Sequence, residues 1–245
     1  MRGICMRISI SGTYSTGKTS TAICLSHYTG IPRTLAKAIR EIMPDAVPGK
    51  RLSEVTPAEF LQLMMRRHCG RAVAEAKLGD NYLSDGSSLQ EWAYGLARTK
   101  YGMNPTDPER PNEKNWPGMN FYREVVDQYE HAFKQHVKAS YDVMIHLDNE
   151  RPITNDGHRP MNEEFRVFCD ELLWNAASEL DIPLYRISGT LTNRVENIVS
   201  LLDLPTVTTL DYAIGEMEQE YAAIDKRLET ERQRTSSLTS TGTNR

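Results

Sequence analysis

Residues 12–19 read Gly12-Thr13-Tyr14-Ser15-Thr16-Gly17-Lys18-Thr19, which matches the pattern G-x-x-x-x-G-K-[ST] at every fixed position. An apolar, β-branched run at 6–11 precedes this stretch, and a helix-compatible run at 19–25 follows it. The pattern forms a phosphate-binding loop, or P-loop, in this strand–loop–helix order. We therefore predict that the chain binds a nucleoside triphosphate through residues 12–19 and the adjoining Ser20. The alternative is a glycine-rich turn that binds nothing.

Each residue type in this loop has a physical task. Gly12 and Gly17 let the backbone curl, so that successive N–H groups point at phosphate oxygens. The start of the following helix adds free N–H donors. Lys18 can reach the β- and γ-phosphates, and the Thr19 hydroxyl can hold Mg²⁺. The loop thus predicts a nucleoside triphosphate and Mg²⁺ as ligands, and by itself it leaves ATP and GTP open.

The composition limits the class of protein. The chain has 245 residues, of which 39% are hydrophobic and 25% charged, and its formal net charge is −4. These values are typical of a soluble α/β protein, and the acidic balance argues weakly against nucleic acid as the main partner. The four cysteines show no metal-ligand or disulfide spacing. No apolar stretch approaches the ~18 residues of a membrane span, and we expect a cytoplasmic protein.

Strands and helices alternate along the chain. Five strands are expected, near 6–11, 29–33, 81–85, 141–148 and 182–187. Helices are expected at 17–28, 35–42, 57–78, 89–101, from 120 onward, after 161 and at 191–202. This alternation predicts an α/β P-loop NTPase fold, in which a parallel sheet is flanked by helices and the site lies at the carboxyl ends of the strands.

The chain outside these elements divides into an insert and a C-terminal part. Residues 102–118 contain four prolines and are expected to form a surface loop. We predict a P-loop domain over 1–205, a helix over 206–234 and a disordered tail over 235–245. A heptad-like apolar stripe on that helix indicates packing along its own domain or, as the alternative, a homodimer seam. The stripe comprises Leu210, Ile214, Met217, Tyr221, Ile224 and Leu228.

A single acid follows the strand at 81–85, in the triplet Asp85-Gly86-Ser87. The carboxyl end of a strand next to the P-loop faces the phosphates. A carboxylate there can accept a proton from an attacking hydroxyl, hold Mg²⁺, or do both. We therefore predict Asp85 as a catalytic residue and, with Thr19, as a metal ligand. The alternative is a turn-forming Asp in an Asp-Gly corner.

Arginines gather in the polar segment after the strand at 141–148. Guanidinium groups on a closing loop neutralise the charge that develops during phosphoryl transfer. Arg159 follows Gly157, which gives the loop a joint, and we predict that Arg159 is catalytic. Arg151 and Arg166 are weaker candidates, and solvated surface arginines are the alternative.

The P-loop, the strand that ends at Asp85, and the Asp-Gly-x-Arg element at 156–159 together resemble the P-loop small-molecule kinases. More narrowly they resemble the AAA-type ATPase and kinase-like family that includes the ribosylnicotinamide kinase domain of the bacterial NAD regulator. The resemblance implies the sheet order 2-3-1-4-5, ATP–Mg as phosphoryl donor, Asp85 near the acceptor hydroxyl, and Arg159 in a lid over ATP. After Asp85 this chain lacks the threonine-rich continuation of those kinases, so the acceptor is left open.

The acceptor pocket is expected among the second strand, the helix at 57–78 and the helix after Asp85. The candidates there are Arg33, Arg66, Arg67, Trp92 and Tyr94. Gly189 and Arg194 are candidates for the adenine side of the donor site. These assignments follow from topology, which places strand ends at the cleft.

The sequence predicts an ATP-dependent kinase that phosphorylates a hydroxyl of a nucleoside-like or other small metabolite. Neither an N-K-x-D motif nor an acid pair at a strand end is present, which disfavours Ras-type GTPases and ATP-driven motors. Two alternatives stay open. One is a nucleotide-gated ATPase or regulator that acts through its C-terminal helix, and the other is a kinase of a modified base or a polynucleotide end.

Overall fold

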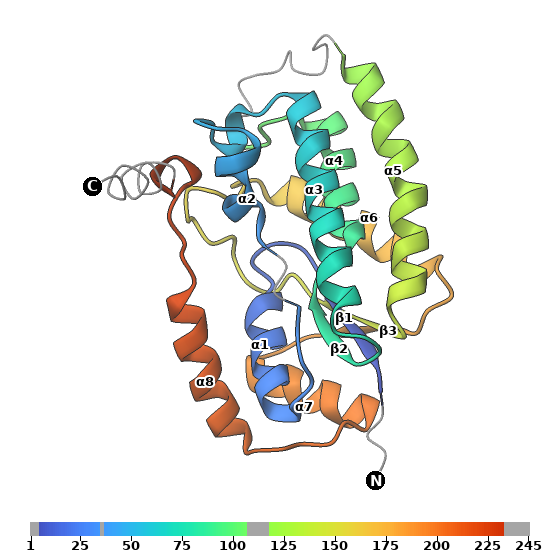
Figure 1. Cartoon of the computed structure of the whole chain (residues 1–245), viewed down its shortest axis with the longest axis vertical. Helices are drawn as coiled ribbons and strands as arrows, with labels where there is room; N and C mark the ends of the chain where they lie inside the picture. The colour runs from blue at the N-terminus through green and yellow to red at the C-terminus, as the bar shows by residue number, and fades with distance from the viewer. Residues whose placement is uncertain (1–4, 35–36, 107–117, 233–245) are drawn as a thin grey trace, which may run out of the picture.

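A four-stranded parallel sheet carries the fold in this computed structural model, which describes residues 5–34, 37–106 and 118–232 (Figure 1). The spatial order is β2-β1-β3-β4. The central strands β1 and β3 are almost entirely buried, as expected for a parallel sheet covered on both faces. The strands are β1 (Arg7–Ser11), β2 (Tyr82–Asp85), β3 (Val143–Leu147) and β4 (Leu184–Ile187).

The predicted strand at 29–33 is not a strand in the described part of the chain, so the prediction of five strands is wrong. Only Arg33 forms a bridge, with Leu83 of β2. Two backbone hydrogen bonds accompany it, from Thr34 N to Leu83 O (2.9 Å) and from Leu83 N to Pro32 O (2.8 Å). Pro32 has no N–H to extend the ladder. The bridge nevertheless lies beside β2, at the edge of the sheet. The predicted order 2-3-1-4-5 places the strand at 29–33 in this position.

Eight α-helices, α1 to α8, surround the sheet in the described ranges, with a short 3₁₀ turn at Leu52–Glu54 and a helical turn at 229–232. Most bounds lie near the predicted ones, but the helix expected at 35–42 begins later. The helix expected from residue 57 begins there: Thr56 and Glu59 exchange side-chain-to-backbone hydrogen bonds as a capping box, with Pro57 in the first turn. The helices are α1 (Lys18–Thr29), α2 (Ile39–Ala46), α3 (Pro57–Ala76), α4 (Ser88–Tyr101), α5 (Met119–Ser140), α6 (Glu163–Ser178), α7 (Leu191–Leu202) and α8 (Leu210–Ala223).

Two apolar cores lie on opposite faces of the sheet, because side chains alternate along each strand. Ile8, Ile10 and Ile145 pack with α1, α7 and α8. On the other face, Met144 and Tyr82 pack with α3, α4, α5 and α6. In Figure 1 the second group of helices extends well beyond the sheet. The carboxyl ends of β1 and β2 therefore open into the space between the two groups of helices.

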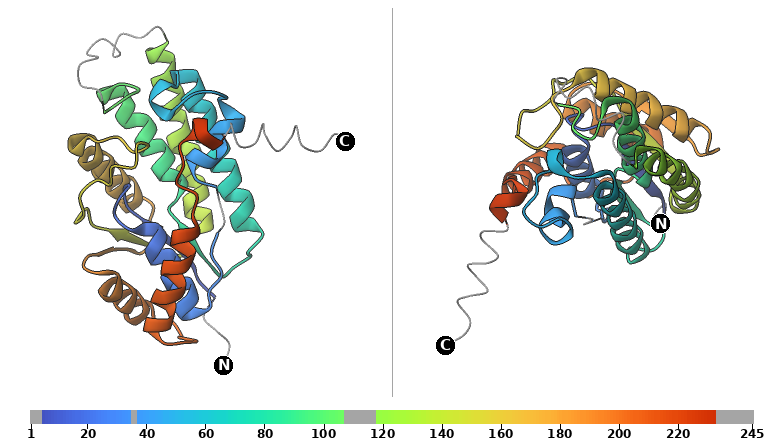
Figure 2. Two further views of the ribbon diagram at one scale, coloured as in Figure 1. Left: turned by 90° about the vertical axis from the view of Figure 1, so that its left-hand side faces the viewer. Right: turned by 90° about the horizontal axis from the view of Figure 1, so that it is seen from above.

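The C-terminal helix α8 packs along α1 of the same chain, as both views of Figure 2 show. Ala213 and Met217 are buried there, and Leu210, Ile214 and Tyr221 pack against the same core. The apolar stripe of α8 thus packs against its own domain, and the homodimer seam is not supported. The helix is also shorter than the predicted 206–234, because the backbone becomes extended at Ile224.

Parts of two sequence predictions lie outside the described residues. They are residues 107–117 of the proline-rich insert and the tail at 235–245. Among the helices that are described, none combines the length and the apolar character that crossing a membrane would require.

Candidate active site

The P-loop connects β1 to α1 in a tightly curled conformation. Gly12, Ser15 and Gly17 all have positive φ, at 132°, 64° and 94°. A Cβ at Gly12 would lie 2.9 Å from the carbonyl oxygen of Leu147 in β3, so only glycine fits there. Successive amides in such a curl form an anion-binding concavity.

The threonines of this loop support it from within. Thr13 and Thr16 are buried. The Thr13 hydroxyl donates to Asn149 Oδ1 (2.5 Å), and the Thr16 hydroxyl donates to the Thr13 carbonyl (2.9 Å). The residues that face the adjacent cavity are Tyr14, Ser15, Gly17, Lys18, Thr19 and Ser20.

Lys18 lies folded against its own loop. Its ammonium donates to the Thr13 carbonyl at 2.5 Å. Burial lowers the pKa of Lys18 to about 8, although the nearby Asp85 carboxylate acts in the opposite direction. A phosphate at the loop would supply the negative charge that this buried cation needs.

Asp85 stands at the end of β2, where the sequence places it, and faces the start of α1. Its Oδ2 atom accepts a hydrogen bond from the Thr19 hydroxyl at 2.6 Å. Mg²⁺ prefers such oxygen ligands and commonly takes one or two from protein while phosphate oxygens and water complete its shell. The pair therefore fits the predicted metal site. Among the described residues no group of three or more His, Cys, Asp or Glu side chains could hold a metal by itself.

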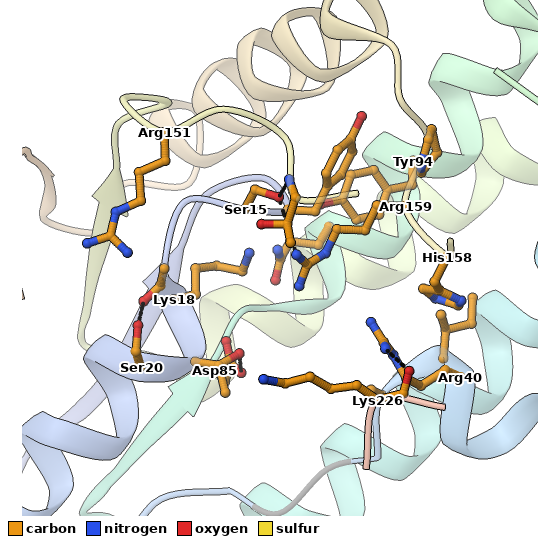
Figure 3. A pocket seen from close by; sticks show the side chains of 18 of the residues that line it. Ser15, Lys18, Ser20, Arg40, Asp85, Tyr94, Arg151, His158, Arg159 and Lys226 are labelled. Atoms are coloured by element: carbon orange, nitrogen blue, oxygen red, sulfur yellow. Dashed lines mark hydrogen bonds between the residues drawn. The ribbon is translucent and has the colours of Figure 1, made fainter. Parts of the chain in front are cut away.

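The predicted lid residue Arg159 reaches over the P-loop (Figure 3). Its Nη1 atom donates to Ser15 Oγ at 3.3 Å. The loop that carries it is held by Asp156, whose Oδ1 accepts from the backbone amides of His158 and Arg159, both at 3.1 Å. Asp156 also forms an ion pair with Arg40 of α2 at 2.9 Å. These contacts bring Lys18, Asp85 and Arg159 to one cavity.

The weaker arginine candidates have different positions. Arg151 lines the cavity. Arg166 does not; it is buried, pairs with Glu163 (2.6 Å) and donates to the Arg151 carbonyl (2.7 Å). It therefore supports the loop from outside the site.

Gly189 and Arg194 do not line the cavity, which corrects their assignment to the adenine side. Arg194 is buried beneath the P-loop, where it donates to the Thr16 carbonyl and pairs with Glu150 (2.9 Å). The same Glu150 carboxylate accepts from Gly189 N at 2.7 Å. Both residues therefore brace the loop rather than face a ligand.

Some of the residues predicted for the acceptor pocket line the cavity, and others do not. Tyr94 lines the cavity, and so does Arg67, which pairs with Glu91 at 3.0 Å. Arg66 is exposed on the outside of α3, and Trp92 is buried in the core. These two assignments are corrected, because a one-residue step on a helix turns a side chain by about 100°.

Arg33 also lies outside the cavity. Its guanidinium forms an ion pair with Glu220 of α8, and burial lowers its pKa. Glu220 lies nearly two hundred residues later in the chain, so the position of Arg33 at a strand end gives no sign of this partner. The substrate role of Arg33 is therefore corrected.

The cavity continues from the P-loop into a second compartment between α2, α3, α4 and α6, with a total volume of about 820 Å³. The sequence does not predict several residues of this compartment, because they belong to no recognisable motif. They are Leu52, Phe60, Gln90, Glu91, Arg98, His158, Phe165 and Lys226.

Positive charge dominates the walls of the cavity. Seven Lys and Arg side chains face three Asp and Glu side chains. Arg98 is buried, with its guanidinium over the ring of Phe60 at 4.2 Å. Such an excess attracts anionic ligands. The basic residues are Lys18, Arg40, Arg67, Arg98, Arg151, Arg159 and Lys226, and the acidic ones are Asp85, Glu91 and Glu218.

Comparison with solved structures finds similarity to deoxyadenosine kinase from M. mycoides. The complex with dCTP aligns with a TM-score of 0.46 at 15% identity, covering 81% of this chain and 99% of that one. The complex with dCMP and a flexible dCDP gives 0.49 at 15% identity over the same shares. The complex with dATP gives 0.42 at 16% identity, covering 81% and 100%.

No curated protein matches the sequence. A family model described as "AAA domain" matches residues 7–194, which span β1 through the first turn of α7. That span contains the P-loop, Asp85 and Arg159, while α8 follows it. The narrower resemblance to ribosylnicotinamide kinases stays a prediction. The chain belongs to the AAA domain family.

Proposed function

We propose that this protein is a kinase that transfers the γ-phosphoryl group of ATP to a hydroxyl of a small, nucleoside-like acceptor. One observation carries the proposal: the P-loop, Asp85 and the compartment with Phe60, Tyr94 and Phe165 belong to one cavity. Its volume of about 820 Å³ is in the range of roughly 300–1,000 Å³ for ligand sites. A nucleotide switch needs no second compartment beyond its triphosphate site, whereas a kinase needs room for an acceptor.

The aromatic walls of that compartment suit a flat ring. Tyr94 and Phe165 lie nearly parallel, with ring centroids 6.5 Å apart, and Tyr14 of the P-loop lies 6.0 Å from Tyr94. Aromatic faces contribute stacking and apolar contact to ligands of this kind. Gln90 is held in place by its donation to the Gly12 carbonyl at 2.7 Å, so α4 is tied to the P-loop.

The chemistry assigned to each residue follows from its place. Asp85 accepts the proton of the acceptor hydroxyl as the oxygen forms its bond to the γ-phosphorus; the bond from that phosphorus to the β,γ-bridging oxygen breaks, and ADP leaves with the electron pair. Lys18 and Arg159 compensate the charge on the transferred group. Mg²⁺ at Thr19 and Asp85 would neutralise phosphate charge when bound.

The test is a turnover assay in which ADP release is measured against a panel of nucleosides, nucleotides and hydroxylated metabolites. We expect strong stimulation by one class of compound, with a phosphorylated product detected by mass spectrometry. Slow hydrolysis that no acceptor changes would overturn the proposal in favour of the ATPase reading.

A further inference from the structure

The segment that follows α8, residues 224–232, runs beside the active-site cavity, which its Lys226 lines; we call it the strap. It leaves α8 at Ala223, in extended conformation, and runs to the side of α2 (Figure 1). The strap lies beyond residue 194, where the AAA domain match ends.

Two contacts fix the strap to the walls of the cavity. The Lys226 carbonyl accepts from Arg40 Nη1 at 3.2 Å. Glu229 Oε1 contacts His158 Nδ1, and only 1% of Glu229 is exposed. Burial acts to raise the pKa of Glu229, but the contact with His158 outweighs it and the pKa is lowered. A carboxylate is buried to this degree only where a partner compensates it.

These contacts also reach Arg159. His158 and Arg159 are neighbours on the loop that Asp156 holds, and Arg40 joins Asp156 to the strap. A Cβ at Gly157 would lie 3.5 Å from Leu228. The strap, α2 and the Arg159 loop thus form one connected network.

Lys226 places a cation in the cavity. In Figure 3 its side chain points toward Asp85, while Lys18 approaches from the P-loop. Its ammonium lies 4.2 Å from the centre of the Tyr221 ring. Among the described residues no carboxylate lies within ion-pair distance of it. An ammonium in this position can bind an anionic group that reaches Asp85.

We propose that the strap completes the active site: Lys226 binds the phosphoryl group under transfer, opposite Lys18, and Glu229 positions the loop that carries Arg159. The role in transfer rests on the proposed kinase function, whereas the placement of the strap over bound nucleotide does not. If the strap only stabilised the fold, removing the charge of Lys226 would leave the reaction unchanged.

The first experiment compares Lys226→Met and Lys226→Arg with Lys138→Met, which changes an exposed lysine on α5. We expect Lys226→Met to lower kcat/KM by about 10²- to 10³-fold, as loss of one transition-state contact does, and Lys226→Arg to restore most of it. Lys138→Met is expected to match the wild type. Wild-type kcat/KM in Lys226→Met would overturn the assignment of Lys226.

The second experiment uses Glu229→Gln, with the exposed Glu196→Gln as control. Loss of the buried contact between the Glu229 carboxylate and His158 is expected to raise hydrogen exchange at residues 151–161 and to lower kcat, while thermal unfolding shows that the variant is folded. Unchanged exchange and unchanged kcat would overturn the positioning role of Glu229.

A third measurement is independent of any acceptor. Lysines are acetylated in the full chain with and without Mg²⁺ and a non-hydrolysable ATP analogue, and the products are read by mass spectrometry. We expect protection of Lys226 and none of Lys138. Equal acetylation of Lys226 in both conditions would overturn its contact with the phosphates. Protection combined with no acceptor-dependent turnover would support the strap and refute the kinase.

Discussion

Asp85 is the residue on which the proposed chemistry depends most directly. Changing Asp85 to Asn keeps its shape but removes the proton acceptor, so we expect kcat to fall by about 10²- to 10⁴-fold while the Kd for ATP changes by less than about threefold. The measurement pairs steady-state turnover with calorimetric ATP binding. Asp148→Asn, which changes an acid outside the cavity that pairs with Arg186 at 3.5 Å, is the matched control. Equal losses in binding and turnover would contradict the role as base.

Lys18 gives a prediction about protons. Its pKa of about 8 in the free protein means that part of the population is neutral at pH 8. Bound phosphates stabilise the ammonium, so ATP binding at pH 8 is expected to take up about half a proton at this site, and none at pH 6, where Lys18 is already charged. The affinity for ATP should fall as the pH rises above 8. Calorimetry in buffers of different ionisation enthalpy measures the uptake, and Lys18→Met should abolish it.

How far a sequence reveals a site depends on whether its residues are neighbours along the chain. Lys18 and Thr19 lie within one motif, and Asp85 ends a strand whose place beside β1 follows from topology. The second compartment is different: Phe60, Arg98 and Lys226 meet only through packing of α3, α4 and the strap. The rotation of α3 about its axis decides whether Arg66 or Arg67 faces the cavity. The apolar pattern of the helix does not fix that rotation to within one residue.

At the scale of elements, a mutation in α8 can distinguish packing along its own domain from a homodimer seam. Ile214 packs against the core around α1, whereas Tyr212 on the same helix is 58% exposed. We expect Ile214→Asp to lower the free energy of unfolding by about 2 kcal/mol, because it places a charge in an apolar contact, and Tyr212→Asp to change it by less than about 0.5 kcal/mol. Urea denaturation measures both. A dimer that Ile214→Asp dissociates without loss of stability would support the seam instead.

The strands show which element-level features follow from sequence. Residues 141–148 and 182–187 were predicted as strands because apolar residues gather there, and β3 and β4 lie within them. Residues 29–33 carry a similar signal, yet Pro32 and the α1 cap at Gly30 leave only one bridging residue. The order of the elements was thus predictable, and the length of a strand was not.

At the scale of the whole molecule, nucleotide binding should stabilise the fold, since the ligand binds the curled P-loop of the folded chain and not the unfolded chain. A ligand at 100 times its Kd contributes about 2.7 kcal/mol, which corresponds to a rise in Tm of roughly 5–10 °C for a chain of this size. Differential scanning fluorimetry with Mg²⁺ and ATP measures the rise. Lys18→Met should lose most of it, and a full shift in that variant would contradict binding at the P-loop.

The strap has a consequence for the timing of the reaction. Because Lys226 extends from the strap into the cavity, we expect the strap to shift when a product leaves, and the buried contact between Glu229 and His158 acts as its latch. The rate of product release should therefore fall as solvent viscosity rises. It should rise in Glu229→Gln, although displacement of the Arg159 loop lowers kcat in that variant.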